Sequence, residues 1–382
     1  MRSRTLHLPQ GPTPREMLRA ASEEAGRDPD FALGFLPPDE NLPSTLAHMA
    51  EAWPGSLRFG CEAVTQFANG DMTTRGSVQL FWFDEPGHHA VVEVVTGTQD
   101  EPPAAEVVDD LARRLAEADG ALLIVDGLRF PAERFLNDLR GDLRGRLDSR
   151  TPLVAGGLAS QELPVTREGA RVFFQERIYS AACLVVALHG VNMRIEVVRG
   201  WSPASPVYTV TRAEGNVVHE IDGEPAVEWY RRFFTVGGEL APMPESAYRF
   251  PLVVEGPAPE RQGLYRTMRT LDDPPGAVTY WGNVHTGDRV RLGMGNDLSL
   301  VHTASQLTAG QEPEAAILYS CIGRETVLGN MAPDEVSNIH RALGGAALSG
   351  FFTFGEIGPT PGGGLAFYNQ TAILVLLSEV RA

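Results

Sequence analysis

The feature that most constrains the fold is a pattern that recurs along the chain, at residues 31–83, 121–188 and 316–377. Each copy has an apolar strand, a helix with apolar residues at helical spacing, a second strand with a glycine turn, and at least one further strand. Residues 250–307 are a candidate for a fourth, diverged copy that lacks the helix. The sequence therefore predicts a mixed α/β fold (α+β), in which repeated strand-helix-strand-strand units form sheets covered by helices and two related halves pack on each other.

The repeat aligns one glycine turn of each copy with the others. These turns contain Gly60, Gly156 and Gly350, and we expect the three glycines to occupy equivalent places. Glycine permits positive φ angles and close approach of another backbone. Two interpretations stay open: tight crossings within a sheet, or turns that line a pocket and offer N–H groups to a ligand.

Glycine and proline cluster at 235–245, directly after an expected helix at 226–234. Such clusters are typical of connections between folded units. We therefore predict two domains, at residues 28–234 and 235–380.

The charge balance disfavours two classes of partner. The chain has 49 acidic and 32 basic residues and a net charge of −17. An acidic surface repels phosphate backbones and anionic lipids, so we expect no nucleic-acid partner and no membrane partner. The chain has no apolar run of about 18 residues, which a membrane-spanning helix requires. Its first residues lack the apolar core of a secretory signal, and we expect a cytoplasmic protein.

Several kinds of catalytic chemistry lack the residues they need. Every basic residue is arginine, which excludes a Schiff-base lysine and a P-loop lysine. The three cysteines (Cys61, Cys183 and Cys321) are far apart in sequence and form no CxxC pair. The nine histidines form no HxH or HExxH motif. We predict no metal site and no enzyme activity.

Two charged residues in the third copy are candidates for ligand binding. Arg324 and Glu356 each follow a buried strand, so we expect them in neighbouring loops that face one concave site. Arginine binds a carboxylate through two parallel hydrogen bonds, and a glutamate accepts an ammonium group. Together they suit a zwitterion such as an amino acid. The alternative is that they pair with each other and fix the turn.

The motifs around these residues resemble those of a known family. Residues 320–324 read Ser-Cys-Ile-Gly-Arg, and residues 350–359 read Gly-Phe-Phe-Thr-Phe-Gly-Glu-Ile-Gly-Pro. In this order they resemble the C-terminal part of the FIST domain, named after F-box and intracellular signal transduction proteins. Residues 121–127 and 209–223 are similar to its N-terminal part. The resemblance covers roughly residues 12 to 380.

The resemblance implies a sensor of small ligands, with amino acids as a suggested ligand class and an unidentified signalling protein as partner. Together with the glycine turns, it singles out as ligand-binding Cys61, Gly156, Gly157, Ser320, Cys321, Arg324, Gly350, Phe351, Gly355, Glu356 and Asn369. We expect the ligand between the two halves and no cofactor. The alternatives are an enzyme that uses the Cys321 thiolate, its pKa lowered by the nearby Arg324, and a haem-based gas sensor.

Overall fold

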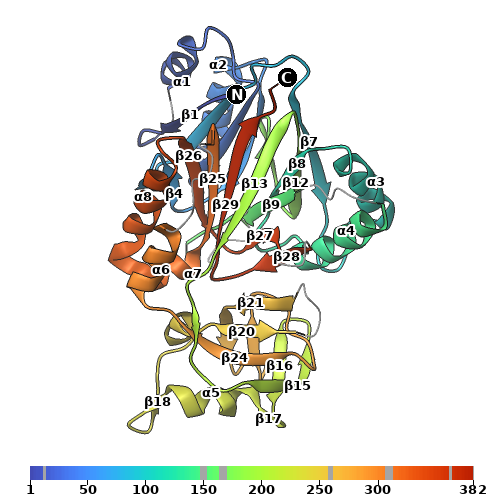
Figure 1. The fold of residues 1–382 in the computed structure, drawn as a ribbon, viewed down its shortest axis with the longest axis vertical. Helices are drawn as coiled ribbons and strands as arrows, with labels where there is room; N and C mark the ends of the chain where they lie inside the picture. Colours follow the sequence, from blue (N-terminus) through green and yellow to red (C-terminus); the bar gives the residue numbers. More distant parts are fainter. Residues whose placement is uncertain are drawn as a thin grey trace.

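The main body of the protein and a smaller insertion form two lobes (Figure 1). The structure is a computed structural model that describes residues 1–11, 14–146, 153–162, 170–256, 261–305, 313–360 and 364–381. The main body contains three six-stranded sheets. The insertion, residues 202–294, leaves the main body after one strand of the third sheet and returns before the next.

The three sheets of the main body have the same strand plan. The first has the order β1 (Arg2–His7), β6 (Ser77–Trp82), β2 (Phe31–Leu36), β3 (Leu57–Glu62), β10 (Val172–Phe174), β11 (Arg177–Tyr179). The second has the order β7 (His89–Thr96), β12 (Ala182–His189), β8 (Gly120–Val125), β9 (Leu153–Leu158), β27 (Glu356–Pro359), β28 (Leu365–Tyr368). The third has the order β13 (Val191–Val198), β29 (Ala372–Glu379), β25 (Ala315–Cys321), β26 (Ala347–Thr353), β4 (Gln66–Ala68), β5 (Asp71–Thr73).

Each sheet is completed by a hairpin from another repeat. In every sheet the two central strands are parallel and the others pair antiparallel. The first repeat gives hairpin β4–β5 to the third sheet, the second gives β10–β11 to the first, and the third gives β27–β28 to the second. The predicted repeat is confirmed. The exchange of hairpins links three related units, whereas the sequence suggested two related halves.

The three glycines occupy equivalent positions in this plan. Gly60 is the fourth residue of its parallel ladder and lies opposite Gly34. Gly156 and Gly350 hold the same place, opposite Leu123 and Leu318. The prediction of equivalent places is therefore confirmed.

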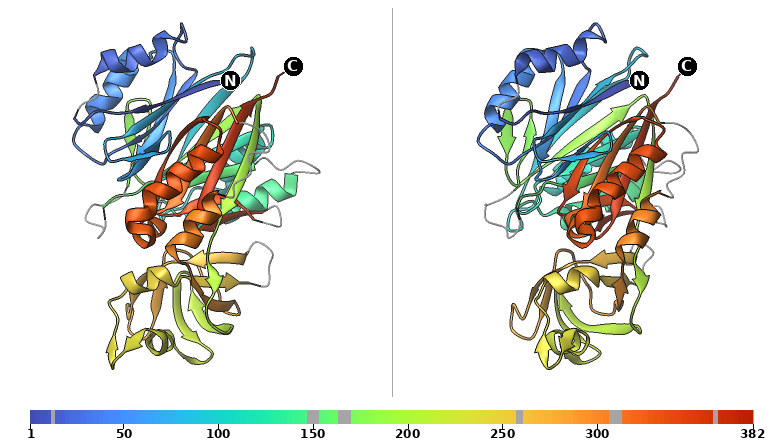
Figure 2. Two further views of the ribbon diagram at one scale, coloured as in Figure 1. Left: turned by 60° about the vertical axis from the view of Figure 1, so that its left-hand side comes forward. Right: turned by 90° about the vertical axis from the view of Figure 1, so that its left-hand side faces the viewer.

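The central strands are mostly apolar because both of their faces are buried. In β25, Ile317 and Tyr319 point into a core shared by the three sheets, whereas Ala316 and Leu318 contact helices. The first sheet is covered by α1 (Arg15–Glu23) and α2 (Leu42–Ala52), and the second by α3 (Ala105–Leu115) and α4 (Ala132–Arg146). The third is covered by α6 (Asp297–Ser305), α7 (Ile322–Leu328) and α8 (Ala332–Ala342), as Figure 2 shows. No helix in the described ranges combines the length and apolarity needed to cross a membrane.

The insertion is built around a nine-stranded antiparallel sheet. Its strands are β14 (Ser202–Pro203), β15 (Tyr208–Glu214), β16 (Val217–Ile221), β17 (Glu224–Pro225), β20 (Leu252–Glu255), β21 (Gln262–Arg266), β22 (Met268–Leu271), β23 (Val278–Tyr280) and β24 (Arg289–Met294). Between β17 and β20 lie α5 (Ala226–Phe234), the hairpin of β18 (Thr235–Val236) and β19 (Glu239–Leu240), and the short helix η1 (Glu245–Arg249).

The sheet of the insertion affects two predictions, the fourth copy of the repeat and the domain boundary near residue 235. A fourth copy at 250–307 is wrong, because the described strands there pair only antiparallel and lack the central parallel pair of a repeat. The glycine- and proline-rich segment 235–245 lies inside the insertion, where it carries a hairpin. The boundary between 234 and 235 therefore separates β15 and β16 from β23 and β24, which belong to the same sheet.

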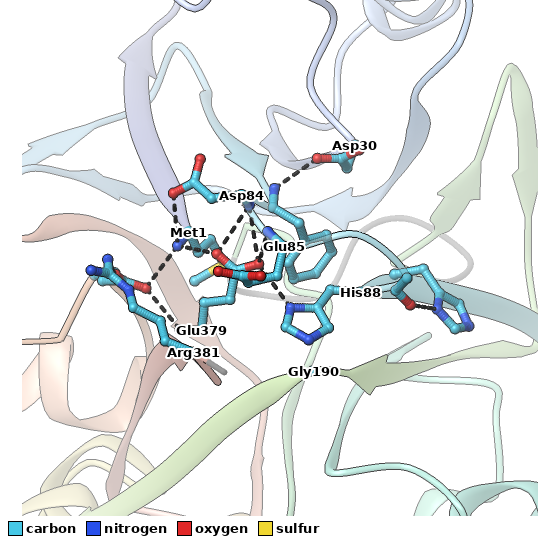
Figure 3. A network of polar contacts seen from close by, with 12 residues as sticks. Met1, Asp30, Asp84, Glu85, His88, Gly190, Glu379 and Arg381 are labelled. Atoms are coloured by element: carbon cyan, nitrogen blue, oxygen red, sulfur yellow. Dashed lines mark hydrogen bonds and ion pairs between the residues drawn. The ribbon is translucent and has the colours of Figure 1, made fainter.

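A buried polar network joins the first and last strands of the main body (Figure 3). The Met1 ammonium group donates to Glu379 and, at 3.0 Å, to Glu314. Glu379 also accepts hydrogen bonds from the N–H groups of Asp84 and Glu85 and contacts His88 Nδ1 at 2.8 Å. The network therefore connects β1, β29 and the segment between β6 and β7.

This network predicts a loss of stability in acid. Burial raises the pKa of Glu379, but hydrogen bonds from Met1, from the Glu85 and Asp84 N–H groups and from His88 lower it more strongly, to about 2. A carboxyl group whose pKa is lowered in the folded state stabilises the folded state. This stabilisation is fully present above the ordinary carboxyl pKa of 4.5 and disappears as pH falls toward about 2. Urea unfolding of wild type and Glu379→Gln should therefore differ most at neutral pH and converge in acid. A difference that stays constant with pH would contradict this assignment.

Candidate functional site at the junction of the two lobes

A small cavity lies where the insertion meets the main body. Its volume is about 30 Å³. The insertion contributes Tyr248, Thr267 and Trp281, and the main body contributes Cys321, Ile322, Gly323, Thr326, Phe354 and Asn369. Two predicted site residues, Cys321 and Asn369, are thus brought together here with seven residues that the sequence analysis did not select as ligand-binding, three of them from the insertion.

The end of β25 places Cys321 and Gly323 at the cavity. The strand ends at Cys321, and α7 begins at the next residue, so Ile322-Gly323-Arg324 is helical where the sequence indicated a turn. Gly323 packs against the side chain of Gln370: a Cβ at this position would lie 2.6 Å from Gln370 Nε2. Gln370 in turn donates to the Tyr248 carbonyl at 3.3 Å, which links the main body to the insertion.

One wall of the cavity is aromatic. The rings of Trp281 and Phe354 stack across the junction, with centroids 5.8 Å apart and an angle of 17° between the planes. The Arg269 guanidinium lies 4.8 Å from the Trp281 ring centroid. A flat apolar group has a matching surface here, since stacked aromatic rings present large apolar faces.

The polar lining includes a hydroxyl without a partner. Thr267 is buried, and its Oγ1 makes no hydrogen bond with any described residue. Its N–H faces Asn369 Oδ1 at 3.5 Å. A buried polar group without a partner costs free energy, so a ligand that bonds to this hydroxyl gains affinity. All nine lining residues are uncharged, which favours a neutral polar ligand over an ion.

Below the cavity, the Cys321 thiol contacts the Glu356 carboxyl group. The backbone N–H groups of Gly323 and Gln370 also point at the sulfur. Burial raises the pKa of the Cys321 thiol, and the adjacent Glu356 carboxyl group raises it further. The structure thus opposes the thiolate that the Cys321-enzyme alternative requires.

The Glu356 carboxyl group already has hydrogen-bond partners within the protein. It begins β27, so it does not lie in a loop as the sequence indicated. Its Oε1 accepts from the Thr353 hydroxyl at 2.8 Å, and its Oε2 accepts from the Thr371 N–H at 3.2 Å. Burial raises the pKa of Glu356 well above its usual value despite these hydrogen bonds, which favours the neutral acid.

Arg324 is fully buried in α7 and pairs with Glu335 of α8. Its Nε donates to Glu335 Oε1 at 3.0 Å, and its Nη1 donates to the Arg199 carbonyl at 3.0 Å. The Ser320 hydroxyl donates to Glu335 Oε2 at 3.2 Å. The sequence suggested that Arg324 either binds a ligand or pairs with Glu356, and both expectations need correction. Its guanidinium does not line the cavity and does not bond to Glu356, because it is hydrogen-bonded to Glu335 and to the Arg199 carbonyl.

The other predicted site residues lie in the protein interior. Gly156 and Gly350 are at the close strand contacts described above. Gly157 packs against Tyr319 and Thr353, and Gly355 packs against Phe367. Cys61 and Phe351 belong to the core shared by the three sheets.

The three insertion residues had weak signals in the sequence. Tyr280 and Trp281 are adjacent aromatic residues, a residue type that more often packs in a core or at a domain interface than binds a ligand. In the structure Tyr280 is fully buried within the insertion, whereas Trp281 faces the main body. Trp281 directly follows the last residue of β23, and the sequence does not say that its side chain meets the other lobe. Within the described residues, no three His, Cys, Asp or Glu side chains gather as a metal site.

A three-unit α/β body with an inserted antiparallel sheet and a cavity between them defines the class of this protein. The family model of the FIST N domain matches residues 30–224, and that of the FIST C domain matches residues 226–359. The chain belongs to the FIST family, whose domains are sensory domains of signal transduction. The boundary between the two family models, like the predicted one, falls within the insertion.

Mycobacterial proteins are similar to this chain. The uncharacterized protein Rv0628c of Mycobacterium tuberculosis H37Rv is 28% identical over 268 residues, which cover 68% of each chain. The uncharacterized protein Mb0898c of Mycobacterium bovis is also 28% identical over 268 residues, which cover 68% of this chain and 67% of that protein.

Proposed function

We propose that this protein senses a small polar metabolite in the junction cavity, passes the bound state to a signalling partner, and is not an enzyme. The observation that carries the proposal is a cavity lined by both lobes in which the buried Thr267 hydroxyl has no described partner. A ligand there contacts the insertion and the main body at once. Its binding therefore depends on how the two lobes are placed.

The small size of the cavity implies that ligand binding changes the arrangement of the two lobes. At about 30 Å³ it is far smaller than the roughly 300–1,000 Å³ typical of ligand pockets. Binding thus requires Trp281 and Tyr248 to move away from Ile322 and Gly323. A ligand shifts such an equilibrium by its difference in affinity for the two arrangements, and the partner recognises the separated form.

The lining also defines the ligand class. The uncharged cavity suits a neutral polar group that accepts a hydrogen bond from Thr267, attached to a flat apolar portion that lies against Trp281 and Phe354. An amino acid held by Arg324 and Glu356 is not supported, because both side chains already have partners inside the protein. Amino acids remain in the ligand screen as a comparison set.

A thermal-shift screen of small metabolites tests the proposal. A ligand that binds only the folded state raises the melting temperature. Thr267→Val keeps the shape of the side chain and removes its hydroxyl, so it should weaken a hit roughly fivefold to tenfold, as expected for one lost hydrogen bond. Thr326→Val, also at the cavity but with a hydroxyl that donates to the Ile322 carbonyl, is the matched control. Equal affinity for wild type and both variants would refute this site.

The thiol-enzyme alternative predicts a different result with iodoacetamide. All three cysteines are buried, and burial raises the pKa of each thiol. We expect native protein to remain unalkylated at neutral pH, and urea-unfolded protein to react at Cys61, Cys183 and Cys321. Mass spectrometry of the peptides measures this. Rapid, ligand-protected alkylation of native Cys321 would favour catalysis over sensing.

The lining of the cavity gives the haem alternative little support. No histidine is among its nine lining residues, and burial raises the pKa of the one cysteine there, which disfavours the thiolate that would bind iron. Our proposal therefore includes no cofactor.

A further inference from the structure

A groove lies at the outer edge of the third sheet, beside β5. Its volume is about 820 Å³, within the roughly 300–1,000 Å³ of ligand-binding pockets. Strand β5 and the two residues after it (71–75) line the groove, together with His7, Leu8, Thr65, Glu325 and Pro333. The proposed function assigns nothing to this groove.

The backbone of β5 has an unpaired edge. Among the described strands, β5 is the last of its sheet and pairs only with β4. Thr65 and Asn69 form backbone hydrogen bonds with β26, and so does Phe67 between them, because every second residue of a strand bonds to the same side. Met72 lies opposite Phe67, so its N–H and C=O point away from β4. An extended chain can form two hydrogen bonds with Met72 here.

Glu325 of α7 lines the groove with a carboxyl group that has no basic partner. It is partly buried, forms a hydrogen bond with the Thr65 side chain, and makes no ion pair with any described residue. Burial raises the pKa of Glu325, and the hydrogen bond with Thr65 only partly opposes this. A basic group brought to the carboxylate stabilises its charged form.

The other charged side chains of the groove are exposed. Asp71 lies 3.8 Å from His7 Nε2, and Arg75 follows β5 at the surface. Exposed charges contribute little to binding because water screens them, whereas a charge-assisted hydrogen bond at a partly buried group contributes more. Glu325 therefore determines the charge preference of the groove, which is for a basic group.

The unpaired edge and Glu325 lie on compatible sides of the sheet. The Met72 side chain packs against the apolar cluster that includes Val327 and Leu328 of α7. Side chains of directly opposite residues in a sheet share one face. The residue of an added strand that pairs with Met72 therefore directs its side chain toward α7, the helix that contains Glu325.

We propose that this groove binds an extended peptide segment, which adds a strand to β5 and pairs an arginine with Glu325. The Met72 backbone supplies the main-chain hydrogen bonds, and the carboxylate selects the basic residue. Peptide binding does not depend on the junction cavity. Only the assignment of the peptide to the signalling partner rests on the proposed function.

The position of α7 supports that assignment. Glu325 lines the groove, and the next residue, Thr326, lines the junction cavity. The helix lies where the insertion meets the main body (Figure 1). A ligand that displaces α7 in the junction cavity would therefore also move one wall of the peptide groove.

The charge preference is tested by calorimetric titration with acetyl-Thr-Val-Arg-Val-Thr-amide, without any metabolite. The comparison peptide has citrulline in place of arginine, which has nearly the same shape and no charge. Wild type should bind the arginine peptide at least about tenfold more tightly, because the citrulline peptide lacks the charge-assisted hydrogen bond. Glu325→Gln should lose this preference. Asp334→Asn, which removes an exposed acid beside Pro333 that does not line the groove, should keep it.

The strand pairing is tested by methylating single backbone nitrogens of the peptide. The arginine that pairs with Met72 uses its N–H, whereas the N–H of the following valine points away from β5. Methylation at the arginine should therefore abolish binding, and methylation at the valine should leave it almost unchanged. Both measurements use wild type, so they do not depend on the folding of Glu325→Gln.

Three results would overturn the proposal. They are equal binding of the arginine and citrulline peptides to wild type, no binding of either at millimolar concentration, and equal binding of the two methylated peptides. Thr267→Val should bind the arginine peptide as wild type does, so a failure of the junction cavity as a sensing site would leave this result unchanged.

Discussion

Alanine at Gly60, Gly156 or Gly350 should prevent the main body from folding stably. A Cβ on these residues would lie 1.8, 1.9 and 2.0 Å from the carbonyl oxygens of Gly34, Leu123 and Leu318. Backbone atoms at the centre of a parallel pair cannot move aside as a flexible side chain can. We expect each variant to lose at least the roughly 1–3 kcal/mol of ordinary overpacking, and to accumulate as insoluble protein.

The control is Gly141→Ala in α4. A Cβ there meets no atom within 4 Å, and alanine favours a helix over glycine by about 1 kcal/mol. This variant should be as stable as wild type or more so. Urea unfolding and the soluble fraction of each variant are the measurements. Wild-type stability of Gly60→Ala, Gly156→Ala and Gly350→Ala would contradict the close approach that defines the three units.

Arg324→Ala should destabilise the protein by about 3–5 kcal/mol, because it leaves the Glu335 carboxylate buried without its partner. The Ser320 hydroxyl alone cannot replace the guanidinium. The effect should appear in the free energy of unfolding, whether or not a ligand is present. A ligand-binding arginine would behave differently: its loss would remove binding and leave the melting temperature almost unchanged.

Two comparisons isolate this effect. Arg212→Ala removes an exposed ion pair with Glu220 and should cost less than about 1 kcal/mol. The double variant Arg324→Met with Glu335→Leu removes both charges and should recover much of the lost stability. If Arg324→Ala unfolds like wild type, the buried pair is not a structural element and the ligand interpretation of Arg324 returns.

The sequence was sufficient to predict the repeats because their signals are local. Each repeat carries its own apolar strand, amphipathic helix and glycine within about seventy residues. The exchange of hairpins was not predictable in this way. β4, β10 and β27 are short, and each pairs with a strand from a different repeat, so their partners follow from packing of the whole chain. The insertion could not be recognised as one unit for a related reason, because the strands of its sheet come from both sides of the predicted boundary at residue 234.

The candidate site was predictable in part. The end of β25 does face a cavity, and Cys321 and Asn369 line it. Arg324 was a misleading signal, because its partner Glu335 lies eleven residues away on the next helix and no pattern marks it. Thr267 and Trp281 come from the insertion, whose position against the main body is fixed by contacts between lobes and not by local sequence.

Hydrogen–deuterium exchange with a metabolite from the thermal-shift screen tests the central claim most directly. If the ligand binds between the lobes, the peptides that contain Thr267 and Trp281 and the peptide that contains Cys321 to Thr326 should all change their exchange rates together. Thr267→Val should reduce this change at equal ligand concentration. A stabilising ligand that changes exchange in only one lobe, away from these peptides, would contradict sensing at the junction cavity.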